Sequence, residues 1–324
     1  MSRVIRLALP APDIVEAILA GKQPAHPTLR DLMQPFPVAW SGQRLQFAIG
    51  DGRSWRDDAA GFRFQTVLFS QSMTRSFPAE KKGRGCKPGP RTRRVRGGSK
   101  WRNGMGVSVV TGANRGIGLE LARQLNARGA SVVAVCRNSS PALDALGVRV
   151  ECGIDVTEPA AWSKLAERLA HDDIDLLVQN AGLLVADSLE DVDPDAVRAQ
   201  FELNAIAPLF LTRALASRLH PGSKVALITS RMGSIADNSS GRYYGYRMSK
   251  AALNAAGACL AHDLKPRGIA VVILHPGAVR TEMTRGHGMI ETDESVRGLL
   301  QRIDELKLET TGRFLHQNGE IVPW

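Results

Sequence analysis

Three closely spaced glycines behind a short apolar run constrain the fold of this chain more than any other feature. The run 107–111 is rich in β-branched residues, which is typical of a buried parallel strand. The segment 119–129 then has leucines at helical spacing, and a second β-branched run follows at 131–135. This order predicts a βαβ unit with a glycine-rich first turn. The glycines are Gly112, Gly116 and Gly118.

Each glycine answers a physical need of a dinucleotide-binding turn. Gly112 permits the tight turn, Gly116 lets the backbone approach a pyrophosphate, and Gly118 lets the helix pack closely on the strand. The phosphates would then lie at the positive end of the helix that follows. An ordinary glycine-rich strand-to-helix turn is the alternative, because a glycine triplet alone is weak evidence. The rest of the chain must decide between them.

The charge of the chain is divided unevenly. Residues 1–104 carry 19 Lys/Arg and 7 Asp/Glu, whereas 105–324 carry 23 and 25, so that +12 and −2 sum to the net charge of +10. The basic balance therefore belongs to an N-terminal extension, 1–104, and says nothing about the partners of residues 105–324. We expect two unlike parts, with the main domain at 105–324.

The N-terminal extension has two regions of its own. Segment 11–34 could form one or two short helices, since Ile14, Ile18 and Leu19 share a helical face. Segment 75–104 is predicted to be basic and disordered: within 81–102 there are ten Lys/Arg and no Asp/Glu. Such a segment cannot bury enough apolar surface to offset its chain entropy.

Segment 11–45 resembles the tail of bacterial site-specific recombinase-like proteins, without a recombinase's catalytic domain. We interpret the extension as a fusion, or as a start placed too far upstream of a natural start at Met105. The alternative is a nucleic-acid-binding arm, because a basic run holds phosphates in a salt-dependent way. Nucleic acid is not expected as a partner of residues 105–324.

Several other classes of protein are not indicated. Pro10, Pro12 and Asp13 interrupt the first apolar run before it could act as a secretory signal, and no stretch of about 18 apolar residues suggests a membrane span. The four cysteines form no Cys-x-x-Cys pair, and no Cys/His cluster has metal-ligand spacing. We expect a cytoplasmic protein without a metal site.

A second constellation of residues points to proton transfer. Tyr246 and Lys250 are four residues apart in a segment of helical character, so both lie on one face of the helix. A neighbouring ammonium favours the phenolate and is expected to lower the tyrosine pKa. Ser230 ends the apolar run 224–230, at the strand edge where open α/β sheets bind ligands.

These motifs, in this order over about 180 residues, resemble the short-chain dehydrogenase/reductase family, whose glycine spacing is Gly-x-x-x-Gly-x-Gly. The resemblance covers 105–324 and implies an α/β fold of Rossmann type, with a doubly wound, mostly parallel sheet. Segment 230–241 and the C-terminal ending, 311–324, look most like the C-factor and sniffer-type carbonyl reductase branch.

The resemblance also implies roles for four residues. Tyr246 would give the proton, Lys250 would lower its pKa and hold the ribose, Ser230 would orient the oxygen, and Asn204 would support a water relay. The chain departs from the family at Gln179, where asparagine is usual. The alternatives are that Ser230 merely ends a strand and that Asn204 is a buried residue with a structural role.

The implied cofactor site combines the glycine turn with later motifs. Arg137 ends the second strand, where a carboxylate would favour NAD, and with Arg115 it suggests NADP instead, with NAD as the alternative. Arg115 could instead cap the turn while Arg137 faces solvent. The remaining candidate residues are Asn114, Ile117, Asp155, Val156, Asn180, Ala181, Gly182, Pro276, Gly277, Val279 and Thr281.

The sequence thus predicts an NADP-dependent oxidoreductase that reduces a carbonyl or oxidises an alcohol of a small molecule. The alternative for the same fold is a C-factor-like signalling or cofactor-sensing protein. The resemblance further implies homo-oligomers, since relatives are often dimers or tetramers.

Overall fold

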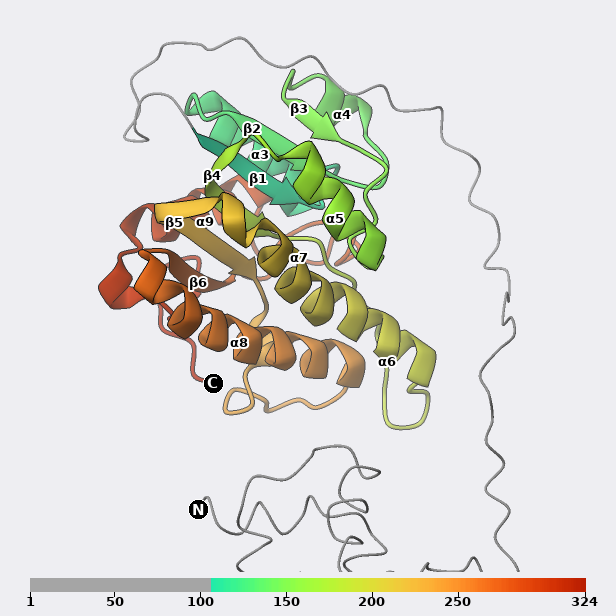
Figure 1. The fold of residues 1–324 in the computed structure, drawn as a ribbon. Helices are drawn as coiled ribbons and strands as arrows, with labels where there is room; N and C mark the ends of the chain where they lie inside the picture. Colours follow the sequence, from blue (N-terminus) through green and yellow to red (C-terminus); the bar gives the residue numbers. More distant parts are fainter. Residues whose placement is uncertain (1–105) are drawn as a thin grey trace, which may run out of the picture. The chain divides into compact units, whose positions relative to one another are not determined.

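The computed structural model describes residues 106–324 of the 324-residue chain (Figure 1). The predictions for 11–34 and 75–104, the recombinase-like resemblance of 11–45 and the nucleic-acid-binding arm all fall outside the described residues.

A single parallel sheet forms the centre of residues 106–324. Its strands run in the order β3-β2-β1-β4-β5-β6-β7, and every neighbouring pair is parallel. The doubly wound α/β fold predicted from the sequence is therefore confirmed. The strands are β1 (Gly106–Thr111), β2 (Val132–Val135), β3 (Arg149–Glu151), β4 (Asp173–Gln179), β5 (Leu219–Ile228), β6 (Ala270–His275) and β7 (Phe314–His316).

Helices cover both faces of the sheet (Figure 1). Helices α3 and α9 pack together on one face, and α5, α7 and α8 lie on the other. The bounds are α3 (Gly116–Ala127), α4 (Pro141–Asp144), α5 (Pro159–Arg168), α6 (Pro194–Phe201), α7 (Ala207–Leu215), α8 (Tyr244–Leu264) and α9 (Thr292–Glu305). A π-helical segment, η3 (Glu202–Ile206), joins α6 to α7. Short 3-10 turns η4 (Ala216–Arg218), η5 (Arg231–Gly233), η6 (Lys265–Arg267) and η7 (Leu308–Thr310) complete the helical elements.

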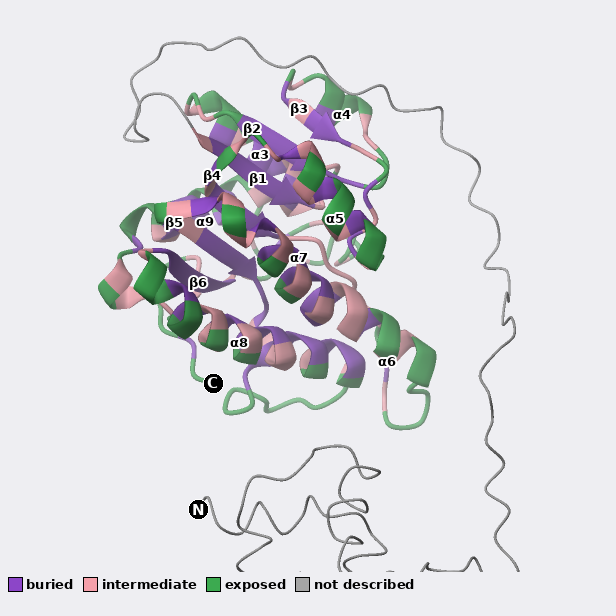
Figure 2. Cartoon of the chain, viewed as in Figure 1, coloured by how far each residue is buried: buried purple, intermediate pink, exposed green. Residues whose placement is uncertain are grey.

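The strands are buried on both sides, which is why they read as continuous apolar runs. Within β1, Val109 belongs to the core beneath α5, α7 and α8, whereas Val110 belongs to the core beneath α3 and α9. Figure 2 shows the burial concentrated in the strands and in the inward sides of the helices. Two apolar layers thus hold the central strands rigidly in place.

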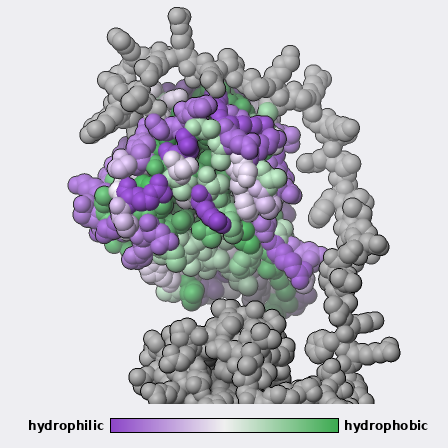
Figure 3. Space-filling model, in the orientation of Figure 1, coloured by the Kyte–Doolittle hydropathy of each residue, from purple (hydrophilic) through white to green (hydrophobic). Residues whose placement is uncertain are grey.

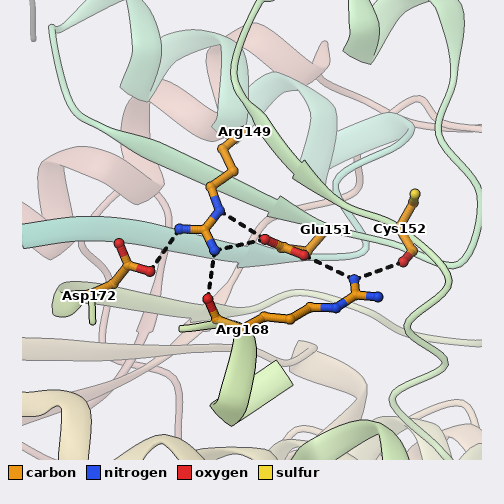
Figure 4. Close-up of polar contacts among 5 residues, drawn as sticks. All are labelled: Arg149, Glu151, Cys152, Arg168 and Asp172. Atoms are coloured by element: carbon orange, nitrogen blue, oxygen red, sulfur yellow. Dashed lines mark hydrogen bonds and ion pairs between the residues drawn. The ribbon is translucent and has the colours of Figure 1, made fainter. Parts of the chain in front are cut away.

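An ion network closes the outer edge of the sheet at β3 (Figure 4). The Glu151 carboxylate, 8% exposed, pairs with Arg149 at 2.8 Å and with Arg168 at 2.9 Å. Arg149 also reaches Asp172 at 2.7 Å. The network joins the edge strand to the end of α5, so charged side chains add to the packing of the buried Val150 at this margin.

The strand order reverses between β1 and β4, since β2 and β3 lie on one side of β1 and β4 to β7 on the other. In open α/β sheets ligands bind outside the carboxyl ends of the strands at such a switch point. The glycine turn follows β1 and the turn 180–182 follows β4. Both therefore lie where the fold is expected to bind its ligand.

Candidate active site

The glycine turn has the geometry that its sequence predicts. Gly112 and Gly116 have φ of +65° and +53°, in the left-handed region that favours glycine. A Cβ on Gly118 would lie 2.2 Å from the carbonyl oxygen of Gly112. Helix α3 begins at Gly116 with no side-chain cap from Arg115 and no acidic residue in its first turn. The positive helix end is thus open to an anion.

Two further residues of the glycine turn serve to fix it. The carbonyl of Asn114 accepts a hydrogen bond from the Ser140 hydroxyl at 2.7 Å, which ties the turn to the start of α4. Ile117 is partly buried against the core beneath α3. These contacts hold the turn in shape before any ligand arrives.

Asn180 fastens the end of β4 to the glycine turn. Its side-chain amide donates to the carbonyls of Thr111 and Gly112 at 3.0 and 3.3 Å. The Thr111 hydroxyl in turn accepts from the backbone N–H groups of Asn180 and Ala181. The Asn180 side chain therefore binds the protein's own backbone and fixes the turn after β4 to the glycine turn. Gln179, where the family usually has asparagine, is buried and donates to Thr212 at 3.2 Å.

The predicted adenosine end contains two charged side chains that face each other. Arg137 lies 3.7 Å from Asp155, and both are partly exposed. Asp155 also accepts from the N–H and hydroxyl of Thr157, at 3.0 and 2.7 Å, so it caps its own turn. Val156 is 9% exposed and packs in the core. Arg115 reaches Glu282 at 2.8 Å in an exposed ion pair.

The segment after β6 lies near Gly116 of the glycine turn, whereas Asn180 and Ala181 lie near Gly112. A Cβ on Gly116 would lie 3.6 Å from Cγ2 of Thr281. Gly277 has φ of +89°, and the Pro276 carbonyl accepts from Ser295 at 2.6 Å. Val279 is buried, and its carbonyl accepts from Thr284 at 2.8 Å. Residues far apart in the sequence are therefore brought to the two sides of one turn.

The predicted catalytic side chains meet at the start of α8. Tyr246 and Lys250 are 7% and 4% exposed, and Nζ of Lys250 lies 5.8 Å from the centroid of the Tyr246 ring. The Ser230 side chain lowers the pKa of Tyr246, and its hydroxyl accepts from the N–H of Met232 at 3.1 Å. Lys250 donates to the carbonyl of Ile228, at the end of β5, at 2.9 Å. Serine, tyrosine and lysine thus form one buried cluster.

The pKa of Tyr246 in the protein alone lies above its ordinary value, not below it as the neighbouring Lys250 led us to expect. Burial raises the pKa of Tyr246 to about 12, and the Ser230 side chain offsets only part of this effect. Burial also lowers the pKa of Lys250 to about 8, since a charged ammonium loses its hydration there. The sequence pattern shows that the two groups are neighbours but does not show how far water is excluded from them.

Asn204 lies in the π-helical segment η3 and is fully buried. Its side-chain oxygen accepts from the N–H of Leu183, and its amide donates to the Leu183 carbonyl, both at 2.8 Å. The amide also donates to Ser249 at 2.9 Å. A Cβ on Gly182 would lie 3.3 Å from the Asn204 oxygen and 3.7 Å from Nζ of Lys250. Asn204, Gly182 and Lys250 are therefore neighbours, as the site prediction requires.

Sequence analysis missed three polar residues near this cluster. All three are buried: Asp187, Gln200 and Ser249. Asp187 accepts a hydrogen bond from the residue before Tyr246, and Ser249 accepts one from Asn204. Gln200 accepts one from the N–H of Val185. A local signal exists only for Ser249, which adjoins Lys250 in sequence. Asp187 and Gln200 act through contacts between distant segments, which no local spacing reveals.

No helix within residues 106–324 is long and apolar enough to cross a membrane. In the same range no three or more His, Cys, Asp or Glu side chains gather where they could hold a metal ion.

The model of the short chain dehydrogenase family matches residues 106–289. A 1-hydroxy-2-glutathionyl-2-methyl-3-butene dehydrogenase of Rhodococcus sp. strain AD45 is 39% identical over 226 residues, which cover 68% of this chain and 100% of the relative. The C-signal protein of Myxococcus xanthus is 44% identical over 154 residues, covering 47% of this chain and 93% of that protein.

The structure also resembles solved ones. An NADPH-bound carbonyl reductase from chicken fatty liver superposes with a TM-score of 0.62 at 31% sequence identity. The match covers 68% of this chain and 99% of the reductase.

Proposed function

Because this chain belongs to the short chain dehydrogenase family, we propose that its domain at residues 105–324 reduces a carbonyl group with NADPH. The observation that carries this proposal is the buried cluster of Ser230, Tyr246 and Lys250 beside Gly182. Oxidation of the corresponding alcohol is the reverse reaction of the same site. As an enzyme of this kind, the chain is proposed to work in the cytoplasm.

The residues present fit a bound dinucleotide. The glycine turn exposes the first turn of α3, which has neither a side-chain cap nor an acidic residue to compete with a pyrophosphate. A side chain at Gly118 would collide with the backbone of Gly112, so the close approach of helix and strand requires glycine. Thr281 faces Gly116 across the turn. We propose that the turn, with Asn114, Ile117 and the segment 276–281, holds the cofactor.

The phosphate that distinguishes NADP from NAD would meet Arg137. Its side chain is 66% exposed, and the carboxylate of Asp155 lies 3.7 Å from its guanidinium. A forked, permanently charged guanidinium suits a phosphate, and the end of β2 carries no carboxylate that would favour a ribose hydroxyl instead. Arg115 adds a second exposed cation at the turn. The NADPH-bound reductase of similar fold supports the same preference.

The chemistry needs a hydride acceptor held beside a proton donor. NADPH, when bound, supplies the hydride. Tyr246 gives its phenolic proton to the carbonyl oxygen, and its pKa of about 12 in the free protein keeps it protonated at neutral pH. Ser230, which acts on the pKa of Tyr246, orients that oxygen.

Lys250 and Asn204 act on Tyr246 after it has given up its proton. Lys250 presents a cation 5.8 Å from the tyrosine ring, which stabilises the phenolate left after transfer. We assign to Lys250 the further role of holding the ribose. Asn204, fixed by Leu183 in the π segment, supports the water relay through which the phenol regains its proton. Gly182, in the turn 180–182, lies beside Asn204 and Lys250.

The experiment that tests the proposal is Tyr246→Phe. Purified protein and the variant are assayed with NADPH against aldehydes, ketones and quinones, and in reverse against alcohols that include a glutathionyl alcohol, prompted by the Rhodococcus relative. We expect turnover to be lost in the variant while NADPH fluorescence still reports binding. Turnover retained by the variant would remove Tyr246 from this role.

A second candidate is supported by the 44% identity with the C-signal protein over 154 residues. A signalling or cofactor-sensing protein of the C-factor branch would bind the dinucleotide without needing Tyr246. It predicts NADPH binding with no turnover in the substrate panel above. The intact serine, tyrosine and lysine cluster favours the reductase.

We also propose that copies of this chain associate. Leu209 on α7 and Tyr244 and Met248 on α8 are apolar side chains exposed on neighbouring helices. Figure 3 shows pale and green surface on the face in view, interrupted by hydrophilic residues. Light scattering of the purified protein would report the mass, and a monomer at all concentrations would contradict association.

A further inference from the structure

Helix α8 takes its N-terminal cap from a distant part of the chain. The residue before it, Tyr243, contributes no side-chain cap. Instead the Asp187 carboxylate accepts hydrogen bonds from the N–H groups of Tyr244 and Gly245, the latter at 3.1 Å. Asp187 is only 6% exposed. Without it, two donors at the start of a buried helix would have no acceptor from a side chain.

The backbone that leads into α8 is strained. Gly241, Arg242 and Tyr243 have φ of +61°, +56° and +54°, so three consecutive residues are left-handed. Such a conformation is costly for arginine and tyrosine and persists only where surrounding contacts fix it. Asp187 supplies one of these contacts, because its carbonyl accepts from the N–H of Tyr243 at 3.0 Å. Its main chain and side chain thus hold three successive residues.

Asp187 is the last of three anchored positions in segment 183–187, which we call the strap. Leu183 is bonded in both directions to the Asn204 side chain at 2.8 Å. The N–H of Val185 donates to Gln200 at 2.9 Å. The anchors alternate along the strap, as they do in an extended chain. The strap therefore connects η3, α6 and the first turn of α8.

The first turn of α8 has no room to move toward α6. A Cβ on Gly245 would lie 2.4 Å from Nε2 of Gln200 and 3.2 Å from Val197. Tyr246 directly follows Gly245 and so lies within this capped turn. The helix start is packed against α6 and is capped by Asp187.

We propose that Asp187 is a positioning residue for Tyr246, holding the first turn of α8 so that the phenol faces Ser230. This inference rests on the catalytic role proposed for Tyr246. Helix ends fray when their donors lack acceptors, and a fraying first turn would displace the phenol. Small displacements of a reacting group cost large factors in rate. Asp187 acts through the helix and touches neither substrate nor cofactor in this proposal.

The test compares Asp187→Ala and Asp187→Asn with a matched capping variant, Asp193→Ala. Asp193 caps the neighbouring helix α6, accepting from Asp195 and Ala196 at 3.4 and 3.0 Å, so its hydrogen bonds lie within the first turn of α6. Asparagine at 187 keeps one acceptor oxygen but presents an amide donor in place of the other. The full chain is used, and kcat is expressed per NADPH-binding site, so that unfolded protein does not count.

We expect Asp187→Ala to lower kcat per site between about tenfold and a hundredfold, with KM for NADPH changed less than about twofold. The kcat per site of Asp187→Asn should lie between those of Asp187→Ala and the unaltered protein. The kcat per site of Asp193→Ala should equal that of the unaltered protein. Equal kcat per site in Asp187→Ala and Asp193→Ala would overturn the proposal. Should the alanine variant fail to fold, the same comparison is made with Asp187→Asn.

Amide hydrogen exchange supplies a readout that needs no turnover. Peptides that cover 241–250 should exchange faster in Asp187→Asn than in the unaltered protein, and Asp193→Ala should leave them unchanged. Unaltered exchange at 241–250 in Asp187→Asn would contradict the cap. A chain that binds NADPH but reduces no carbonyl would refute the proposed function instead, which keeps the two failures distinct.

Discussion

The ammonium of Lys250 lies 5.8 Å from the centroid of the Tyr246 ring, and both side chains are almost fully buried. Burial moves their pKa values in opposite senses: that of the phenol rises to about 12 and that of the ammonium falls to about 8. At neutral pH the free protein therefore holds a protonated phenol beside a charged ammonium. This is the state that a carbonyl reduction requires at its start.

A pH dependence follows from the lysine. We expect kcat/KM for a carbonyl substrate to fall as pH rises through about 8, because Lys250 loses its charge there while Tyr246, with a pKa of about 12, stays protonated. The measurement is the pH profile of kcat/KM at saturating NADPH. In Lys250→Arg the guanidinium stays charged, so residual activity should lack this fall. A fall near pH 8 that persists in the arginine variant would assign it to another group.

The cofactor preference can be tested at Arg137. We expect Arg137→Ala to raise KM for NADPH about tenfold to a hundredfold, the range for losing a charged hydrogen bond, and to leave KM for NADH nearly unchanged. The measurement is the ratio of kcat/KM for the two cofactors. Arg128→Ala is the control, since Arg128 follows the far end of α3 and pairs with Asp304. Equal effects on both cofactors would show that Arg137 does not recognise the phosphate.

Much of this architecture is readable in the sequence because parallel strands are buried on both faces. The β-branched runs at 107–111 and 131–135 correspond to β1 and β2, and Gly129, with φ of +81°, lies just beyond the end of α3. Tyr246 and Lys250 share the buried side of α8 as their spacing predicts. Periodicity and glycine spacing are local properties, so a sequence states them directly.

Other features depend on long-range contacts and could not be read in this way. The short strand β7 is defined by pairing with β6, and its three residues carry no periodicity of their own. Asp187 looks like one of several acids in a loop, and only the folded chain brings it to α8. The pKa of Tyr246 depends on how completely packing excludes water, which spacing does not encode.

The glycine turn offers a stability test with a functional readout. We expect Gly118→Ala to destabilise the protein by about 1–3 kcal/mol, as overpacking does, because its Cβ would lie 2.2 Å from the Gly112 carbonyl oxygen. The backbone must shift to relieve the contact, so NADPH affinity should also fall. Gly147→Ala, at φ of +66° in open space, should cost about 1–2 kcal/mol and leave NADPH affinity unaltered. Thermal unfolding and NADPH fluorescence measure both quantities, and unchanged affinity in Gly118→Ala would contradict the expectation.

The network at the sheet edge in Figure 4 makes a prediction about stability alone. Glu151→Gln should destabilise the protein by about 3 kcal/mol, because it leaves two arginines at a largely buried site without this carboxylate. Asp195→Asn breaks an exposed pair, with Arg198, and should cost no more than about 0.5 kcal/mol. Urea unfolding of both variants makes the comparison. Similar losses in the two would mean that burial adds nothing to the Glu151 network.

The π-helical turn at Glu202–Ile206 has a consequence for how this chain can change. Such a turn contains one residue more than an α-helical turn, so deleting a single residue within it would let α6 and α7 merge into one regular helix. The flanking helices α6 and α7 would keep nearly their present faces, because the residue removed is the extra one that the wide turn accommodates. The residues within the turn would change face instead, and Asn204 would lose its bonds to Leu183. A deletion within 202–206 should therefore harm the site more than it harms the helix that carries it.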